Sequence, residues 1–257
     1  MKRVLFFIYG VLSYAVGVAA LLYLIAFIGD FGVPKTIDGI SEMSTWKAIS
    51  INLSLIMLFG LQHSIMARPK FKEKWTKIIS PVVERSTYVL FTFFALIILF
   101  YFWQPLGGEV WNVSADSALF YTLYALFFMG WTILLLATFL INHFDLFGLR
   151  QVYLNLMNKP YTPLVFKERG LYKSVRHPIY TGLLLGFWCT PHMTISHLFL
   201  AVLWTVYIFY AISLEERDLI NEWGEKYLEY KNRTGKVFPK FSKNIKPETE
   251  KVWISNK

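Results

Sequence analysis

Long apolar runs separated by short polar segments dominate the chain. They predict membrane-spanning helices at about 4–28, 48–67, 86–103, 118–142, 178–190 and 195–214. Most of these runs approach or exceed the roughly 18–20 residues that cross a bilayer. They are continuous, whereas the strands of a membrane barrel alternate between apolar and polar positions. We therefore predict an all-α, polytopic membrane bundle of five to six transmembrane helices, built as a single domain over 1–257.

The fifth apolar run is short. At 1.5 Å per residue, 178–190 reaches only roughly 20 Å, whereas the hydrocarbon core is about 30 Å thick. The fifth and sixth runs therefore form a hairpin that stops short of the far face or begins below the membrane surface. A bundle of five spans with a broken hairpin is the alternative topology.

An amphipathic helix is predicted after Glu216 and ends near Gly235 and Pro239. Apolar and aromatic side chains recur along one side at helical spacing, and they are Leu219, Ile220, Trp223, Tyr227 and Tyr230. This helix lies in the membrane interface or folds over a site beneath it. The last residues, 242–257, are polar, and we expect a flexible tail there.

The distribution of lysine and arginine residues predicts how the protein is oriented in the membrane. The 257 residues are 55% hydrophobic and only 17% charged, with a net charge of +9, whereas a soluble domain is usually about 25% charged. All 26 Lys and Arg residues except Lys35 and Lys47 lie at the amino terminus, in 68–85, in 150–176 or after 216. This distribution predicts that both termini are cytoplasmic, and we expect a bacterial inner membrane. It accounts for the positive charge without a nucleic-acid partner.

Charged residues stand at both ends of the predicted hairpin, where lipid makes them costly. Arg176 and His177 precede Pro178, which suits the first turn of a helix, and a helix amino terminus favours an anion. Glu215 and Glu216 close the hairpin; they point about 100° apart, so one can face a ligand while the other pairs with an arginine. A plain helix start and a solvated helix end are the structural alternatives.

The two charged groups lie on the same side of the membrane, so they suit a ligand that offers both a carboxylate and an ammonium group. S-adenosylmethionine offers both, although other zwitterions would fit equally well. Aromatic side chains near the hairpin can shape its base or face its sulfonium, and they are Tyr172, Tyr180, Trp223 and Tyr227. We therefore predict a cofactor-binding part over 161–238.

The run GLYKSVRHPIYTG at 170–182 resembles the signature of the isoprenylcysteine carboxyl methyltransferase family. Glu215, Glu216 and the segment 224–230 complete the likeness. The resemblance implies a membrane-embedded S-adenosylmethionine site with contacts from Leu164, Val165, Tyr172, His177, Pro178, Ile179, Tyr180 and Glu215. The charge pattern adds Arg176 and Glu216 to this set. Ala211 stands where prenylcysteine enzymes carry a substrate-binding arginine, which argues against a prenylcysteine substrate.

The rest of the chain resembles methanethiol S-methyltransferases. The likeness is carried by NHFDLFGLRQV at 142–152, LQHS at 61–64 and LLGFWCTPHMT at 184–194. It implies transfer of a methyl group from S-adenosylmethionine to methanethiol, a small volatile thiol, giving dimethyl sulfide and S-adenosylhomocysteine.

Such a reaction needs a thiolate, because the thiolate is the effective nucleophile. Candidate bases are His63 and His143, the latter oriented by Asp145, while Tyr180 binds the cofactor or holds the thiolate. Each has a structural alternative: His63 as a helix–helix hydrogen bond, and Asp145 as an ion-pair partner of Arg150. The sequence indicates no metal site.

Three other functions share these helices. One is a methyltransferase of a lipid or larger thiol, which would need a lipid-sized opening. Another is a membrane protein without enzymatic activity, which would bind no cofactor. The third is a haem or quinone protein that uses His63 and His143, which would absorb visible light.

Overall fold

Long helices make up most of the molecule. The computed structural model describes residues 1–40, 42–240 and 252–253. Within these residues, five helices are long and apolar enough to cross a membrane: α1 (Lys2–Gly29), α2 (Thr45–Ala67), α4 (Pro81–Phe102), α5 (Ala118–Ile141) and α9 (Ile195–Trp223). The predicted all-α, multi-pass membrane bundle is confirmed.

Shorter elements connect the long helices. The helices among them are α3 (Pro69–Trp75), α6 (His143–Leu146), α7 (Leu149–Leu156), the 3₁₀ turn η1 (Gly170–Lys173), α8 (Pro178–Trp188) and α10 (Glu225–Arg233). Four short strands form two antiparallel pairs, β1 (Glu109–Asn112) with β3 (His192–Thr194) and β2 (Phe166–Lys167) with β4 (Val252–Trp253). These small pairs close loops and leave the helical architecture unchanged.

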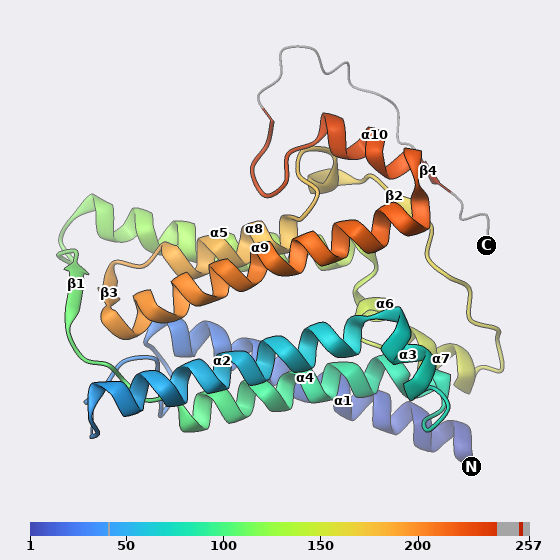
Figure 1. Ribbon diagram of the computed structural model, residues 1–257, viewed down its shortest axis with the longest axis horizontal. Coiled ribbons are helices and arrows are strands. Elements are labelled where there is room, and N and C mark those ends of the chain that lie inside the picture. Colours follow the sequence, from blue (N-terminus) through green and yellow to red (C-terminus); the bar gives the residue numbers. More distant parts are fainter. Residues whose placement is uncertain (41, 241–251, 254–257) are drawn as a thin grey trace.

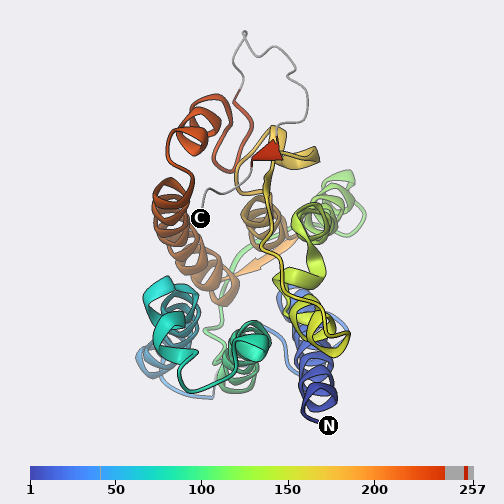
Figure 2. The same ribbon diagram turned by 90° about the vertical axis from the view of Figure 1, so that its right-hand side faces the viewer.

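The helices form two layers (Figures 1 and 2). One layer contains α1, α2 and α4, and the other contains α5, α8 and α9, with α10 packed outside the second layer. A continuous cluster of buried side chains fills the space between the layers and includes Phe27, Leu96, Trp103, Phe187 and Trp204. Contacts between α2 and α9 join the layers.

The short fifth element is confirmed as α8, which has 11 residues. The chain then continues in extended form, and β3 pairs with β1 in the connection between α4 and α5, with Asn112 opposite His192. The hairpin therefore reaches the same end of the bundle as that connection, although its first helix is too short to do so alone.

Glycines bring α8 into backbone contact with α5. A Cβ added to Gly130 would lie 2.6 Å from the carbonyl oxygen of Gly182, closer than two such atoms can approach. Small residues commonly allow membrane helices to pack this tightly. The contact fixes the position of Tyr180, which lies half a turn before Gly182.

The last predicted span and the first part of the predicted amphipathic helix form one continuous helix. We placed the end of the span at 214, with a separate amphipathic helix after Glu216, but α9 continues without a break to Trp223. The helix ends where Gly224 adopts a positive φ of 55°, a conformation that glycine takes readily. On the predicted apolar side, Tyr227 and Tyr230 of α10 are 1% and 2% exposed, whereas Leu219, Ile220 and Trp223 of α9 are only half-buried. The predicted tail, 242–257, lies outside the described residues except for β4.

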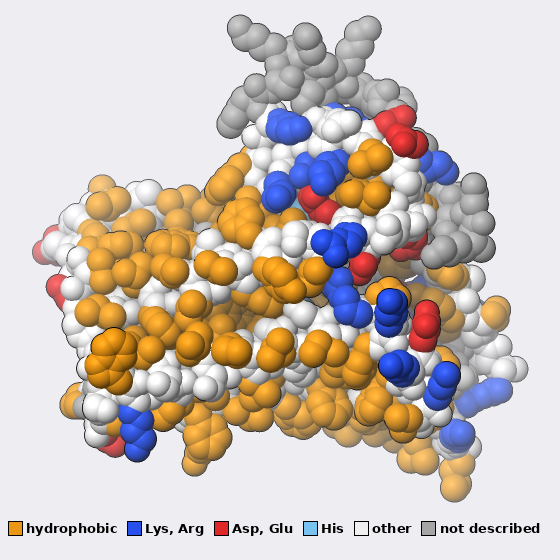
Figure 3. Space-filling model, in the orientation of Figure 1, with side chains coloured by type: hydrophobic (Ala, Val, Ile, Leu, Met, Phe, Trp, Pro, Cys, Tyr) orange, Lys and Arg blue, Asp and Glu red, His pale blue; other side chains and the backbone are white. Residues whose placement is uncertain are grey.

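The amino-terminal end of α1 and helix α10 lie at the same end of the bundle (Figure 1). Lysine and arginine side chains gather at this end, while apolar side chains cover most of the remaining visible surface (Figure 3). The lysine and arginine residues that cluster along the sequence therefore also cluster in space, at one end of the bundle.

Candidate active site

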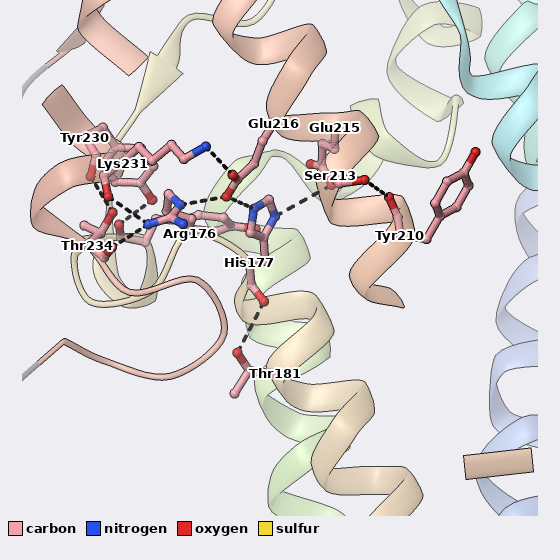
Figure 4. A network of polar contacts seen from close by, with 11 residues as sticks. Arg176, His177, Thr181, Tyr210, Ser213, Glu215, Glu216, Tyr230, Lys231 and Thr234 are labelled. Atoms are coloured by element: carbon pink, nitrogen blue, oxygen red, sulfur yellow. Dashed lines mark hydrogen bonds and ion pairs between the residues drawn. The ribbon is translucent and has the colours of Figure 1, made fainter. Parts of the chain in front are cut away.

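A buried ion-pair network lies at the charged end of the α8–α9 hairpin (Figure 4). The Arg176 Nε lies 2.9 Å from Glu216 Oε1, and its Nη1 donates to the carbonyl oxygens of Lys231 and Thr234 at 2.9 and 2.5 Å. The Lys231 Nζ lies 2.9 Å from the other carboxylate oxygen of Glu216. Arg176 and Glu216 therefore tie the hairpin to α10.

His177 lies between the two adjacent glutamates (Figure 4). Its Nε2 is 3.2 Å from Glu216 Oε1, and its Nδ1 is 3.7 Å from Glu215 Oε2. The Glu215 side chain is 45% exposed, against 6% for Glu216, and Glu215 also hydrogen-bonds to Tyr180. The two carboxylates thus separate as predicted: Glu216 pairs with Arg176, and Glu215 is left accessible to a ligand.

The other predicted cofactor residues lie on α8 or in the segment between α7 and α8. The Tyr172 carbonyl accepts a hydrogen bond from Tyr230 Oη at 2.7 Å, Pro178 begins α8, and Ile179 packs against the core. Leu164 and Val165 are half-buried in the segment before β2. Burial, with the nearby Glu168 carboxylate, raises the pKa of Tyr230, so its hydroxyl stays protonated and can donate.

A second polar cluster lies between the two layers. Tyr88 Oη is 3.0 Å from both ring nitrogens of His63, and Thr92 Oγ1 is 3.2 Å from His63 Nδ1. The hydroxyls of Tyr207 and Ser64 are 3.0 Å apart. Tyr88 belongs to the buried core cluster, and Tyr180 and Tyr207 both pack against that cluster. The structure therefore brings His63 and Tyr180, predicted from distant segments, to one region.

Sequence reasoning missed Tyr88 and Tyr207. Both lie within apolar runs, where the hydropathy pattern counts a tyrosine with the other aromatic residues. The available signal was chemical: a buried tyrosine hydroxyl needs a hydrogen-bond partner.

His143 belongs to a different environment. Its Nδ1 is 2.8 Å from Thr138 Oγ1, its Nε2 is 2.9 Å from Tyr14 Oη, and its ring stacks on Phe139 at 4.3 Å between centroids. Burial lowers the pKa of His143. Both ring nitrogens are thus engaged by hydroxyl groups.

Asp145 does not contact His143 in the way we expected. Its Oδ1 accepts a hydrogen bond from Arg150 Nη1 at 2.8 Å, and its Oδ2 accepts one from Tyr161 at 3.3 Å. The alternative of an Asp145–Arg150 ion pair is therefore confirmed, and the orienting contact is replaced by the two hydroxyls around His143.

A cavity of about 630 Å³ opens at the same end of the bundle, between α3, α4, α7 and the segment that leads to β2. Leu164 and Asp145 are the predicted residues that line it, among the residues that the structure describes. On one wall, the side-chain oxygens of Gln151 and Asn155 are buried without a hydrogen-bond partner. Buried acceptors of this kind usually have a partner, so these two oxygens suit a ligand with N–H or O–H groups.

Two positively charged side chains, Lys72 and Arg85, also line the cavity. Burial, reinforced by the Arg85 charge, lowers the pKa of Lys72. The Arg85 guanidinium also lies 4.9 Å from the ring centre of Tyr88. The cavity therefore presents positive charge to a ligand and adjoins the His63 cluster through Arg85.

Comparison with known proteins gives matches along nearly the whole chain. A methanethiol S-methyltransferase from Crocosphaera subtropica is 46% identical over 93% of both chains. Methanethiol S-methyltransferase 1 from Bradyrhizobium diazoefficiens is 48% identical over 91% of this chain and 81% of the relative. The chain belongs to the methanethiol S-methyltransferase family.

As a member of the methanethiol S-methyltransferase family, the protein is a thiol S-methyltransferase. A more distant likeness is to Nurim from Xenopus laevis, 35% identical over 66% of this chain and 62% of the relative. No protein-family model and no solved structure matches the chain.

Methyl transfer requires a donor site next to a place for the thiol. In this methanethiol S-methyltransferase family member, charged and polar side chains line the cavity, and Glu215 lies beside His177 at the charged end of the α8–α9 hairpin. The His63 cluster adjoins them from the opposite layer.

Proposed function

We propose that this protein transfers the methyl group of S-adenosylmethionine to methanethiol, giving dimethyl sulfide and S-adenosylhomocysteine, at the cytoplasmic end of the bundle. The observation that carries this assignment is the 46% identity over 93% of both chains with a protein named for methanethiol methylation. The gathering of lysine and arginine at the end that holds both the site and the amino terminus supports a cytoplasmic placement.

The donor set suits the cofactor. Lys72 and Arg85 can bind a carboxylate, and the unpaired oxygens of Gln151 and Asn155 can accept hydrogen bonds from amino groups. Leu164 offers an apolar contact at the same cavity. S-adenosylmethionine supplies all of these partners, together with a methyl group on a positively charged sulfur.

Among the hairpin residues, Glu215 is the one we assign to the sulfonium, because it is accessible and its carboxylate favours a cation. Arg176 and Glu216 hold the hairpin against α10 and act through position. We assign the wall around the sulfonium to the remaining predicted residues, which are Val165, Tyr172, His177, Pro178 and Ile179.

We assign the thiol to the space between Tyr180 and His63. We assign His63 as the base that accepts the thiol proton; the hydroxyls of Tyr88 and Thr92 contact its ring nitrogens. Alkyl thiols are mostly protonated near pH 7, since even Cys has a pKa of about 8.5. Removing the proton in a site sheltered from water raises the fraction of the reactive thiolate.

The test measures dimethyl sulfide in the headspace above membranes that contain the protein, S-adenosylmethionine and methanethiol. We expect the unmodified protein to form dimethyl sulfide, and Glu215→Ala to lower kcat/KM for S-adenosylmethionine by roughly tenfold or more, because the loss of an interaction with a charged group usually costs about 1.5–3 kcal/mol. Glu222→Ala removes a carboxylate from an exposed position of the same helix and should retain full activity.

Cofactor binding without dimethyl sulfide would refute the thiol assignment and favour a lipid or a larger thiol. A protein that binds no S-adenosylmethionine would refute the assignment altogether.

A further inference from the structure

Four aromatic side chains fill the space between the two layers next to the His63 cluster. The rings of Phe59 and Trp204 stack at 4.7 Å, Phe187 packs on Trp204 at 5.3 Å, and Tyr207 packs on Phe59 at 6.1 Å between centroids. Phe59, Phe187 and Trp204 are 6%, 0% and 4% exposed. We call these four residues the aromatic stack; it draws on α2, α8 and α9.

The stack begins where the polar cluster ends. Phe59 lies one helical turn before His63, and their rings are parallel within 11° at 5.4 Å. Tyr207 belongs to both groups, since its hydroxyl bonds Ser64 and its ring contacts Phe59. Along α8, Phe187 lies seven residues beyond Tyr180, or roughly 10 Å deeper in the bundle. The stack therefore lies on the side of the thiol site away from Glu215.

The rings have little room to move aside. A Cβ added to Gly60 would lie 3.2 Å from the Tyr207 ring, so the α2 backbone closes one side of that ring. Phe187 also packs edge-on against Trp131 of α5 at 6.1 Å. Closely packed interiors of this kind resist even one added methylene.

We propose that the aromatic stack forms the floor of the thiol site and limits the length of the substrate's alkyl chain. This inference rests on the proposed function and adds the determinant of substrate size. On this proposal, the site between Tyr180 and His63 accepts a single methyl group, whereas a propyl or butyl chain has to displace Phe59 or Trp204. A lipid tail would need the whole space that the stack occupies.

The experiment measures kcat/KM for methanethiol, ethanethiol, 1-propanethiol and 1-butanethiol with the full-length protein. Phe59→Ala removes the centre of the stack, and Phe59→Leu shortens it with less risk to folding. Phe100→Ala is the matched control, because Phe100 is a buried phenylalanine of α4 that packs on Phe27, away from the stack.

We expect the butanethiol-to-methanethiol ratio of kcat/KM to rise about tenfold or more in Phe59→Ala, consistent with the discrimination that one methylene provides in an apolar pocket. Phe59→Leu should give a smaller rise, and Phe100→Ala should leave the ratio unchanged. Binding of S-adenosylmethionine should stay the same in all three variants.

Ratios that remain within about twofold of the unmodified protein in both Phe59 variants, with cofactor binding intact, would overturn the inference. So would efficient methylation of 1-butanethiol by the unmodified protein. A failure of the proposed function is a separate result, in which the unmodified protein does not methylate methanethiol at all.

Discussion

Glu215 and Glu216 are neighbours in the chain, but the structure gives their side chains different surroundings. Glu216 is buried with Arg176 and Lys231, whereas Glu215 is half exposed beside His177 and Tyr180. Helical geometry predicts that the two diverge. It does not say which one turns inward, because that depends on α10, which supplies Lys231 from outside the hairpin.

The surroundings of His143 define its protonation. Thr138 donates its single hydroxyl hydrogen to the carbonyl of Leu135 at 2.7 Å, so its oxygen accepts from His143 Nδ1–H. The Nε2 atom is then the acceptor for Tyr14 Oη. His143 is therefore a neutral imidazole in the folded protein.

This neutrality predicts a dependence of stability on pH. Because the folded pKa of His143 is lowered from its ordinary value of 6.5, the unfolded chain binds more protons as pH falls below that value, and stability is lost there. Thermal unfolding in detergent should show a larger drop in midpoint between pH 7.5 and 5.5 for the unmodified protein than for His143→Gln. Equal drops in both proteins would contradict the assignment.

The pairing of Asp145 with His143 could not be predicted correctly from proximity in sequence. Residues two apart on a helix do not face each other, and α6 is a single turn. The partner of Asp145 is Arg150 on α7, which turns back after Gly148 adopts a positive φ of 84°. The sequence did identify the ion pair as an alternative, since both residues are close in the chain.

At the scale of elements, the junction between the α8–α9 hairpin and α10 centres on the buried Arg176–Glu216 ion pair, which Lys231 and two backbone carbonyls extend. Arg176→Met should destabilise the protein by up to about 3 kcal/mol, the lower end of the cost of breaking a buried pair, because Lys231 still faces Glu216. The measurement is the thermal unfolding midpoint in detergent. Adding Glu216→Gln to Arg176→Met should recover part of the loss, because it removes the buried carboxylate, whereas Lys231 is 37% exposed and can be hydrated without it.

Arg68→Met provides the comparison for this junction. Arg68 pairs with Asp218 at 2.7 Å, but their side chains are 30% and 39% exposed, and such pairs contribute about 0–1 kcal/mol. An equal loss in Arg68→Met and Arg176→Met would show that burial of the Arg176 pair is unimportant.

Elements with strong apolar patterns were predictable, and short ones were not. The five long helices follow from uninterrupted apolar runs. Helix α3 lies in a segment where lysines mask any pattern, and the β1–β3 pair joins residues about 80 positions apart, which no local pattern encodes. The end of α9 was misplaced because charged residues at 215–218 suggested a boundary, although no helix breaker occurs before Gly224.

At the scale of the whole molecule, the proposed orientation in the membrane predicts that two loops are labelled from opposite sides of the membrane. In a Cys189→Ala background, Asp116→Cys lies between α4 and α5 and Lys77→Cys lies between α3 and α4, both at exposed positions. A membrane-impermeant maleimide should label Asp116→Cys in intact spheroplasts and label Lys77→Cys only after permeabilisation. The reverse pattern would contradict the proposed orientation.

The sequence could not predict that the candidate site residues from distant segments lie close together in the folded molecule. His63 and Tyr180 are separated by more than a hundred residues and belong to different layers. Each was a candidate on its own chemistry, but only the packing of α2 against α9 brings them together. The same packing supplies Tyr207 from α9, while Tyr88 comes from α4 in the layer of His63; neither had a distinguishing signal in the apolar runs.

The shortness of α8 has a consequence for how the protein is made. A helix of 11 residues is well below the roughly 17–25 residues of a transmembrane helix, so we expect α8 to enter the membrane together with α9 rather than as a separate segment. On this view, the glycine contact between α5 and α8 forms only after α9 has been inserted. We therefore predict that a truncated chain that ends before α9 lacks the proposed site.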